Sequence, residues 1–454
     1  MPRTAMIRVY AILACFLFLA PSGDAWGQGG PTLTDSTRTA PAAAPLGEIR
    51  PVQSPNQILP VVMDARIGEH PDRTRFVVEV SDPFRVRIFT LSNPDRVVID
   101  MPEVLWRLNG PPRPSGRGLV KSYRYGLFRT GNSRFVIDLN SPASAAEPMI
   151  LPPEDGHGYR IVVDLFPTDE AKFDRLAGWP SDLRAREAAE QIASASTSGA
   201  QMPSPGPTTM AAPRGGARRI IVVDAGHGGI DSGTTGVDGT MEKDLVLDEA
   251  LRLRNVLQRR GYVVHLTRET DVYIPLRERV NIARGFDADL FVSLHADSNP
   301  DASVSGASVY TLSESGSDKE AAALARKENQ SDVIAGVDLA GQSSPVASIL
   351  IDLAQRDTMN RSGRFAETVV EDLSRATDIL PREPHRSAAF VVLKAPDVPA
   401  VLIELGYLSN ARDCAQVRMN DWRDGVASAI SDAVDRDFGV AGPASAVAAK
   451  QAAE

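Results

Sequence analysis

Two short apolar segments, each running toward a histidine, constrain this chain more than any other feature. Residues 220–223 (IIVV) come shortly before His227, and residues 290–294 (LFVSL) lead directly into His295. Runs of β-branched and aliphatic residues of this length are typical of strands buried on both faces of a parallel sheet. Open α/β folds bind their ligands at the carboxyl edge of such a sheet, so we expect both imidazoles there.

A carboxylate between the two segments indicates what the histidines could do. Glu242 follows the first segment, and two imidazoles with one carboxylate form a three-ligand zinc set that leaves a fourth position for water. Glycines on both sides of His227 allow the backbone to turn sharply there. A single histidine after a strand is more often a hydrogen-bonded surface residue. The residues alone therefore leave both interpretations open.

Four motifs between residues 219 and 438 carry a resemblance to a known family. They are similar to the signature blocks of the zinc-dependent N-acetylmuramoyl-L-alanine amidases, in the same order: IVVDAGHGGIDSGTTG, MEKDLVLDEALRLRNVL, VSLHADS and VLIELGYLSN. The resemblance implies hydrolysis of the amide between N-acetylmuramic acid and L-alanine in peptidoglycan. It also implies that His227, Glu242 and His295 bind one catalytic zinc ion, and that Glu404 is the catalytic glutamate.

The chemistry of amide hydrolysis agrees with these roles. Cleaving an amide needs a stronger nucleophile than neutral water, and zinc supplies one by acidifying its water. Glu404 ends an apolar run, where it could pass a proton from water to the leaving amine. The alternative is a surface carboxylate that caps the next turn. We expect Asp224 to orient His227 as a hydrogen-bond acceptor, and Asp297 to do the same or to approach the metal.

The N-terminus has the features of a secretory signal. Arg3 and Arg8 both precede an apolar stretch at residues 9–20. This stretch is too short to span a bilayer. We predict a cleavable signal over residues 1–25, a spacer over residues 26–57, no stable membrane anchor and a periplasmic protein; a retained anchor is the alternative. The net charge of -9 argues against nucleic acid as a partner.

Residues 58–168 are expected to form an all-β sandwich. Segments in this region repeat an arginine, three apolar residues and a carboxylate, as in RFVVEVS, RVVIDMP, RFVIDLN and RIVVDLF. Short strands separated by turn residues are typical of a sandwich. The region resembles the AMIN domain that precedes such catalytic domains in Gram-negative division enzymes, which implies binding to septal wall or division proteins. A β spacer without a binding role is the alternative.

The remainder of the chain separates into a linker, a catalytic domain and a tail. Residues 169–217 are predicted to be a flexible linker, because much of this stretch can bury little apolar surface. Residues 218–438 alternate strands and helices, which predicts an α/β domain with a mixed twisted sheet and helices on both faces. One of the predicted strands is AAFVVL at residues 388–393. Residues 439–454 are expected to be a disordered tail.

Residues 313–358 form an insertion that a minimal sheet does not need. Its second half has an apolar stripe at helical spacing, formed by Val346, Ile349, Leu350 and Leu353. Ordinary packing against the sheet is one interpretation. The resemblance to division amidases implies another, in which a helix at residues 318–335 plugs the site and Glu328 occupies the open zinc position. The amphipathic stripe would then bind an activator with a LytM-type domain.

Three functions therefore compete. The leading one is an exported, autoinhibited zinc amidase that splits the septal wall during daughter-cell separation. The second is a zinc peptidase that cuts within the stem peptide. The third is a non-catalytic scaffold that binds septal peptidoglycan, although a scaffold would not need His227, Glu242, His295 and Glu404.

Overall fold

The computed structural model describes residues 59–108, 116–154, 156–183, 185, 218–337 and 349–440, and for residues 349–355 it describes the backbone alone. The predicted signal, the predicted spacer, most of the linker and most of the tail lie outside these ranges. Within the described part of the chain, no helix is both long enough and apolar enough to cross a membrane.

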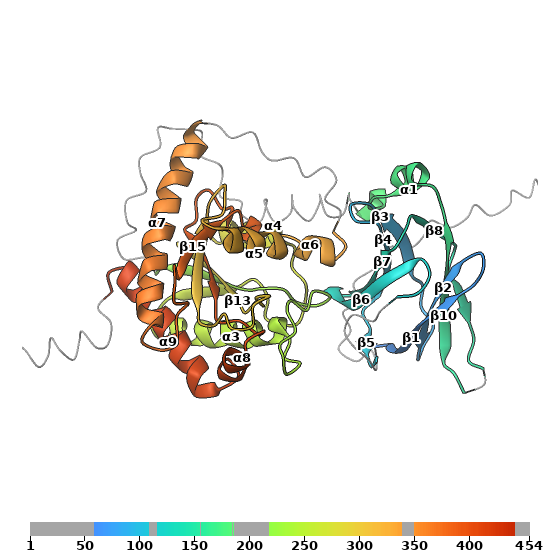
Figure 1. Cartoon of the computed structure of the whole chain (residues 1–454), viewed down its shortest axis with the longest axis horizontal. Coiled ribbons are helices and arrows are strands. Elements are labelled where there is room, and N and C mark those ends of the chain that lie inside the picture. The colour runs from blue at the N-terminus through green and yellow to red at the C-terminus, as the bar shows by residue number, and fades with distance from the viewer. Residues whose placement is uncertain are drawn as a thin grey trace, which may run out of the picture. The chain divides into compact units, whose positions relative to one another are not determined.

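The N-terminal domain is strand-rich, as predicted, and its strands form two sheets (Figure 1). The strands are β1 (Val61–Glu69), β2 (Thr74–Val80), β3 (Arg87–Leu91), β4 (Arg96–Pro102), β5 (Leu105–Trp106), β6 (Val120–Arg129), β7 (Asn132–Leu139), β8 (Ala143–Ala145), β9 (Met149–Leu151) and β10 (Tyr159–Pro167). One sheet has the order β5-β1-β2-β10-β8, with β9 on β10, and the other has the order β3-β4-β7-β6. Phe76 and Phe135 come from different sheets and pack edge to face at 5.4 Å in the shared core.

Cross-strand pairing explains the repeated pattern of arginine and carboxylate. Arg75 of β2 stands opposite Asp164 of β10, and Arg134 of β7 stands opposite Asp100 of β4. The first pair has two contacts of 2.7 Å, and the second has contacts of 2.5 and 2.9 Å. Because side chains alternate along a strand, the arginine and the carboxylate four residues later share the face turned away from the core.

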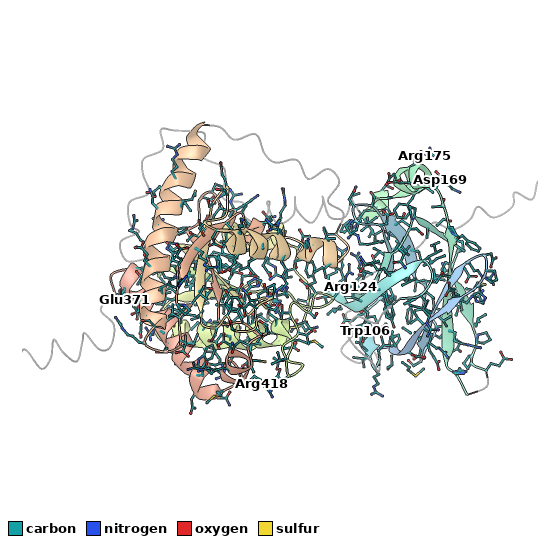
Figure 2. All side chains as sticks on the ribbon, in the orientation of Figure 1. Trp106, Arg124, Asp169, Arg175, Glu371 and Arg418 are labelled. Atoms are coloured by element: carbon teal, nitrogen blue, oxygen red, sulfur yellow. The ribbon has the colours of Figure 1, made fainter. Side chains whose placement is uncertain are left out.

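The folded region continues beyond the predicted boundary at residue 168. Helix α1 (Glu170–Leu176) begins after Asp169, whose carboxylate accepts the Lys172 N–H at 2.8 Å. Figure 2 labels Asp169 and Arg175 on this part of the chain. Phe173 is buried in the core of the sandwich, and Trp179 is buried in a separate apolar cluster. The start of the predicted flexible linker is therefore packed onto the β domain.

The C-terminal domain has the predicted mixed sheet. Its strands are β11 (Ile220–Ala225), β12 (Val263–Leu266), β13 (Leu290–His295), β14 (Ser308–Leu312), β15 (His385–Ala388) and β16 (Ala400–Glu404), in the order β12-β11-β13-β16-β14-β15. Strand β14 pairs antiparallel with β16, and the other pairs are parallel. The carboxyl ends of β11, β13 and β16 therefore meet at one edge.

Helices cover both faces of this sheet (Figure 1). The α-helices of the described part of this domain are α3 (Glu242–Arg259), α4 (Leu276–Gly285), α5 (Lys319–Glu328), α6 (Ser331–Ile334), α7 (Ile349–Leu373), α8 (Ala411–Gln416) and α9 (Asn420–Asp437). Side chains of α3, α7 and α9 share one core with Val292 of β13, whereas those of α4 and α5 share the opposite core with Phe291. This alternation explains why the strand is apolar at consecutive positions.

The predicted strand at residues 388–393 is wrong. Strand β15 ends at Ala388, and Val391–Leu393 form a 3-10 helix, η1. The Asn329 side chain from the insertion accepts the Val391 N–H at 2.8 Å and donates to the Ala389 carbonyl at 2.9 Å. These contacts satisfy backbone groups that a longer strand would have used in the sheet.

The insertion contains two helices where one was expected at residues 318–335. Asp318 caps α5 by accepting the Ala321 N–H at 2.8 Å, α5 ends at Glu328, and the short α6 begins at Ser331. The second predicted helix is the start of α7. Val346 lies outside the described residues, as do the side chains of Ile349, Leu350 and Leu353. The proposed activator stripe therefore remains a prediction.

One buried carboxyl group in α3 is expected to destabilise the fold at high pH. Glu249 is 0% exposed, and neither of its side-chain oxygens has a hydrogen-bond partner among the described residues. Burial raises its pKa to about 8, although Arg252 and Arg423 oppose the shift. The folded state must keep this group protonated, so its contribution to stability falls as the pH rises from about 4.5, the ordinary value of its pKa, through about 8.

We predict that Glu249→Gln stabilises the protein by about 1–3 kcal/mol at pH 8 and by much less at pH 5. Urea unfolding at the two pH values measures the difference. The exposed Glu314→Gln variant is the matched control, because it removes a solvated carboxylate. An equal effect of Glu249→Gln at both pH values would contradict the prediction.

Candidate active site

His227 lies just beyond β11, at the carboxyl edge of the sheet. Its backbone has a φ of 57°, which is unusual for a residue other than glycine. Its Nδ1 atom is 2.9 Å from the Asp231 carboxylate. If Nδ1 donates to that carboxylate, Nε2 carries a free lone pair, and Nε2 has no hydrogen-bond partner among the described residues.

His295 and Glu404 end two adjacent parallel strands. They are register partners in the pairing of β13 with β16, so both side chains lie at the same edge. The His295 ring packs against Gly226, where an added Cβ atom would come within 2.5 Å of the ring. Glycine at position 226 is therefore needed for the two imidazoles to come close, and their ring centroids are 4.9 Å apart.

Glu242 is the first residue of α3, and two main-chain N–H groups hold its carboxylate. Oε2 accepts the Thr234 N–H at 2.8 Å, and Oε1 accepts the Ala296 N–H at 2.9 Å. Oε1 also lies 3.0 Å from His227 Nε2 and 3.2 Å from His295 Nδ1. The structure thus brings together the three residues that the sequence suggested as metal ligands.

Glu328, at the end of α5, reaches the same two imidazoles. Its Oε2 atom is 3.3 Å from His227 Nε2 and 3.2 Å from His295 Nδ1, and the residue is 5% exposed. Burial raises the pKa of Glu328 to about 7, while the two imidazoles oppose the shift. Glu328 therefore lies at the point where the two imidazoles converge.

The donor set fits a zinc ion. Two imidazole nitrogens and a Glu328 oxygen lie within 4.8 Å of one another, and Glu242 adds a second carboxylate at the same nitrogens. Nitrogen and carboxylate oxygen donors are the ones zinc takes in hydrolases. The buried Nε2 atom of His227 makes no hydrogen bond among the described residues, although carboxylate oxygens of Glu242 and Glu328 lie 3.0 and 3.3 Å away, and a bound ion would satisfy it.

Glu404 is fully buried beside this group. Its Oε2 atom accepts the Asp297 N–H at 2.9 Å, and Oε1 has no partner among the described residues. Burial raises the pKa of Glu404 well above its ordinary value, and the nearby carboxylates Asp297, Glu242 and Glu328 raise it further. A raised pKa makes the ionised carboxylate a stronger base toward a proton from water.

Asp297 has a different environment from the one expected. It accepts the Thr234 hydroxyl at 2.7 Å and forms an ion pair with Lys327 of α5, and no hydrogen bond to an imidazole is seen in the described residues. A pocket of about 570 Å³ lies at the site. Its lining includes His227, Thr234, Lys327 and Glu328.

The expected role of Asp224 is taken by Asp231. The Asp224 oxygens accept hydrogen bonds from Thr267, Ser293 and Arg279 at 2.6–2.9 Å, which tie the sheet to its flanking segments. Asp231 instead contacts His227, and it was not singled out from the sequence. Its position four residues after His227, within a glycine-rich turn, was the available signal.

Comparison with known proteins identifies the family. A family model described as N-acetylmuramoyl-L-alanine amidase matches residues 221–436, and an AMIN domain model matches residues 64–151. The N-acetylmuramoyl-L-alanine amidase AmiC of Escherichia coli O6:H1 is 33% identical over 378 residues, which cover 81% of this chain and 87% of that protein. AmiC of Neisseria meningitidis serogroup B is 33% identical over 408 residues, covering 88% and 95%.

The chain therefore belongs to the family of N-acetylmuramoyl-L-alanine amidases, a class of amide hydrolases. This confirms the predicted family and enzyme class. The matches to both AmiC proteins extend over most of their length. Among solved structures, the catalytic domain of the amidase CwlV from Bacillus (Paenibacillus) polymyxa var. colistinus is 26% identical, with a TM-score of 0.34, and the alignment covers 49% of this chain and 99% of that chain.

We predict that Asp231→Asn lowers zinc affinity about 10- to 100-fold, because an amide no longer fixes the His227 ring as a carboxylate does. Competition with a chromogenic chelator measures the affinity directly. The exposed Asp421→Asn variant should bind zinc as the wild type does. Unchanged affinity in Asp231→Asn would show that the contact does not position His227.

Proposed function

We propose that this protein is a zinc-dependent amidase that cleaves the bond between N-acetylmuramic acid and L-alanine in peptidoglycan, and that it splits the septal wall during cell division. The convergence of His227, His295 and Glu242 beside the buried Glu404 carries this proposal. The two AmiC relatives align with this chain over both domains, and their name, N-acetylmuramoyl-L-alanine amidase, supports the proposed substrate. A periplasmic location follows from the predicted signal over residues 1–25.

The metal and the chain would divide the chemistry between them. Zinc held by His227, His295 and Glu242 would act as a Lewis acid on the amide carbonyl and would acidify water. Glu404 would accept a proton from water at its unpartnered Oε1 and transfer it to the leaving amine. The Asp297 N–H fixes the other oxygen of Glu404 and so holds the carboxyl group in place for both transfers.

The described conformation is proposed to be the inhibited one. Glu328 would be a fourth protein ligand, and four protein ligands are typical of closed structural zinc sites rather than catalytic ones. Lys327 occupies the neighbouring position through its ion pair with Asp297 and a 2.9 Å contact with the Thr234 hydroxyl. The end of α5 would therefore exclude both water and substrate.

Release would require a partner that binds the open state more tightly than the closed one. We propose a LytM-type activator that docks on the predicted apolar stripe formed by Val346, Ile349, Leu350 and Leu353. The β domain would bind septal wall or division proteins. These partners come from the family resemblance, and the strand-rich N-terminal domain is compatible with them.

The zinc peptidase and scaffold alternatives make different predictions about products. An amidase releases whole stem peptides with a free L-alanine amino group, whereas a peptidase releases fragments of the stem. A scaffold releases neither. Mass spectrometry of the soluble products from purified sacculi distinguishes the three.

We predict that Glu328→Ala raises dye release from labelled sacculi at least tenfold above the wild type without an activator, because it opens the fourth position. Glu404→Ala should abolish release, and so should removal of zinc by a chelator, with zinc restoring activity. Glu314→Gln serves as a control with an exposed carboxylate. Equal activity of wild type and Glu328→Ala would refute the plug while leaving the enzyme in place.

A further inference from the structure

The segment that follows Glu328 is held by side chains of the β domain. We propose that the outer face of the sheet β3-β4-β7-β6 is a docking surface for residues 333–337 of the same chain, and that this contact keeps the plug in the active site. The proposal rests on the autoinhibition proposed above and names a second element that maintains it.

In this contact, side chains of the β domain donate hydrogen bonds to the main-chain carbonyls of four consecutive residues, 333–336. Arg96 donates to the Val333 carbonyl at 2.6 Å, and Arg124, labelled in Figure 2, donates to the Ile334 carbonyl at 2.5 Å. Arg134 donates to both the Ala335 and the Gly336 carbonyls at 3.0 Å. The Trp179 indole N–H also donates to the Gly336 carbonyl, at 3.2 Å.

These carbonyls belong to the last turn of α6 and the residues just beyond it. The last carbonyls of a helix lack intrahelical partners and carry partial negative charge, so guanidinium groups are well suited to them. The arginines are themselves fixed. Arg134 is 0% exposed and forms its bidentate pair with Asp100, and Arg124 contacts Asp138 at 2.5 Å.

An apolar cluster completes the surface. Val98 and Val136 from the outer face of the sheet are buried with Ala335 and Val337 of the docked segment, together with Phe128 and Trp179. Gly336 adopts a φ of 70°, and an added Cβ atom would meet the Val136 side chain at 3.0 Å. The surface therefore combines hydrogen bonds to the main chain with close packing of small side chains.

The docked segment is mechanically linked to the active site. Ser331 donates a hydrogen bond to Asp231, the residue that contacts His227. Asp332 accepts the Tyr273 hydroxyl at 2.7 Å and the Leu276 N–H at 2.9 Å. Because α6 begins three residues after Glu328, withdrawal of Glu328 requires this segment to move, and the arginine contacts oppose that movement.

The test compares substitutions at the docking surface with matched substitutions elsewhere in the full-length, zinc-loaded protein. Arg134→Lys keeps the charge but loses the planar fork, and Arg75→Lys makes the same change in the equivalent pair of the other sheet. Gly336→Val disturbs the docked segment without altering the β domain. Gly439→Val is its control, since Gly439 also has a positive φ and nothing lies within 4 Å of its added Cβ atom.

Two readouts separate docking from inhibition. We expect hydrogen exchange at the amides of residues 334–337, which are hydrogen-bonded in the docked segment, to accelerate about tenfold in Arg134→Lys and Gly336→Val. Dye release without an activator should rise severalfold in the same variants. Arg75→Lys and Gly439→Val should match the wild type in both measurements.

The outcomes that overturn the inference are distinct from those that overturn autoinhibition. Unchanged exchange in both docking variants refutes the docking surface. The docking variants could show faster exchange but wild-type dye release, while Glu328→Ala is active. That result refutes the role of the docking surface in holding the plug. If Glu328→Ala is itself no more active than wild type, autoinhibition fails and this inference fails with it.

Discussion

The architecture of the active site depends on the cost of burying carboxylates. Glu242, Asp297, Glu328 and Glu404 are each no more than 5% exposed, and they gather at one edge of the sheet. A buried charge without a partner is strongly unfavourable. The chain lowers this cost with main-chain donors, because the N–H groups that follow His295, at Ala296 and Asp297, hold Glu242 and Glu404.

The insertion at residues 313–358 contributes to the same balance. Lys327 places its ammonium group on Asp297, and Glu328 lies between the two imidazoles. In the inhibited state proposed above, the end of α5 would therefore be electrostatically complementary to the site as well as blocking it. If α5 leaves, Asp297 would lose its ammonium partner and the two imidazoles would lose the Glu328 carboxylate at the same time.

Much of the catalytic domain follows from local sequence pattern. The apolar runs before His227 and His295 indicated buried strands, and the carboxyl-edge rule placed both imidazoles and Glu404 together. The pattern failed at residues 388–393, where a long-range contact from Asn329 replaces strand pairing. It also failed for Asp224, because an aspartate near a histidine in sequence can bond in another direction, here to Arg279.

In the β domain, the repeat of arginine and carboxylate was visible in the sequence. The two cross-strand pairs described above, Arg75 with Asp164 and Arg134 with Asp100, differ in a way that the sequence does not reveal. Arg134 is buried against the insertion, whereas Arg75, in the equivalent pair, keeps 31% of its side chain exposed. Because Arg96 and Arg124 bind main-chain carbonyl groups, Val333 and Ile334 could change their side chains and still be bound, whereas Ala335 and Gly336 are restricted by their packing against the sheet. Recognition of this kind tolerates evolutionary drift at the first two positions of the bound segment and places the constraint there on the arginines that receive it.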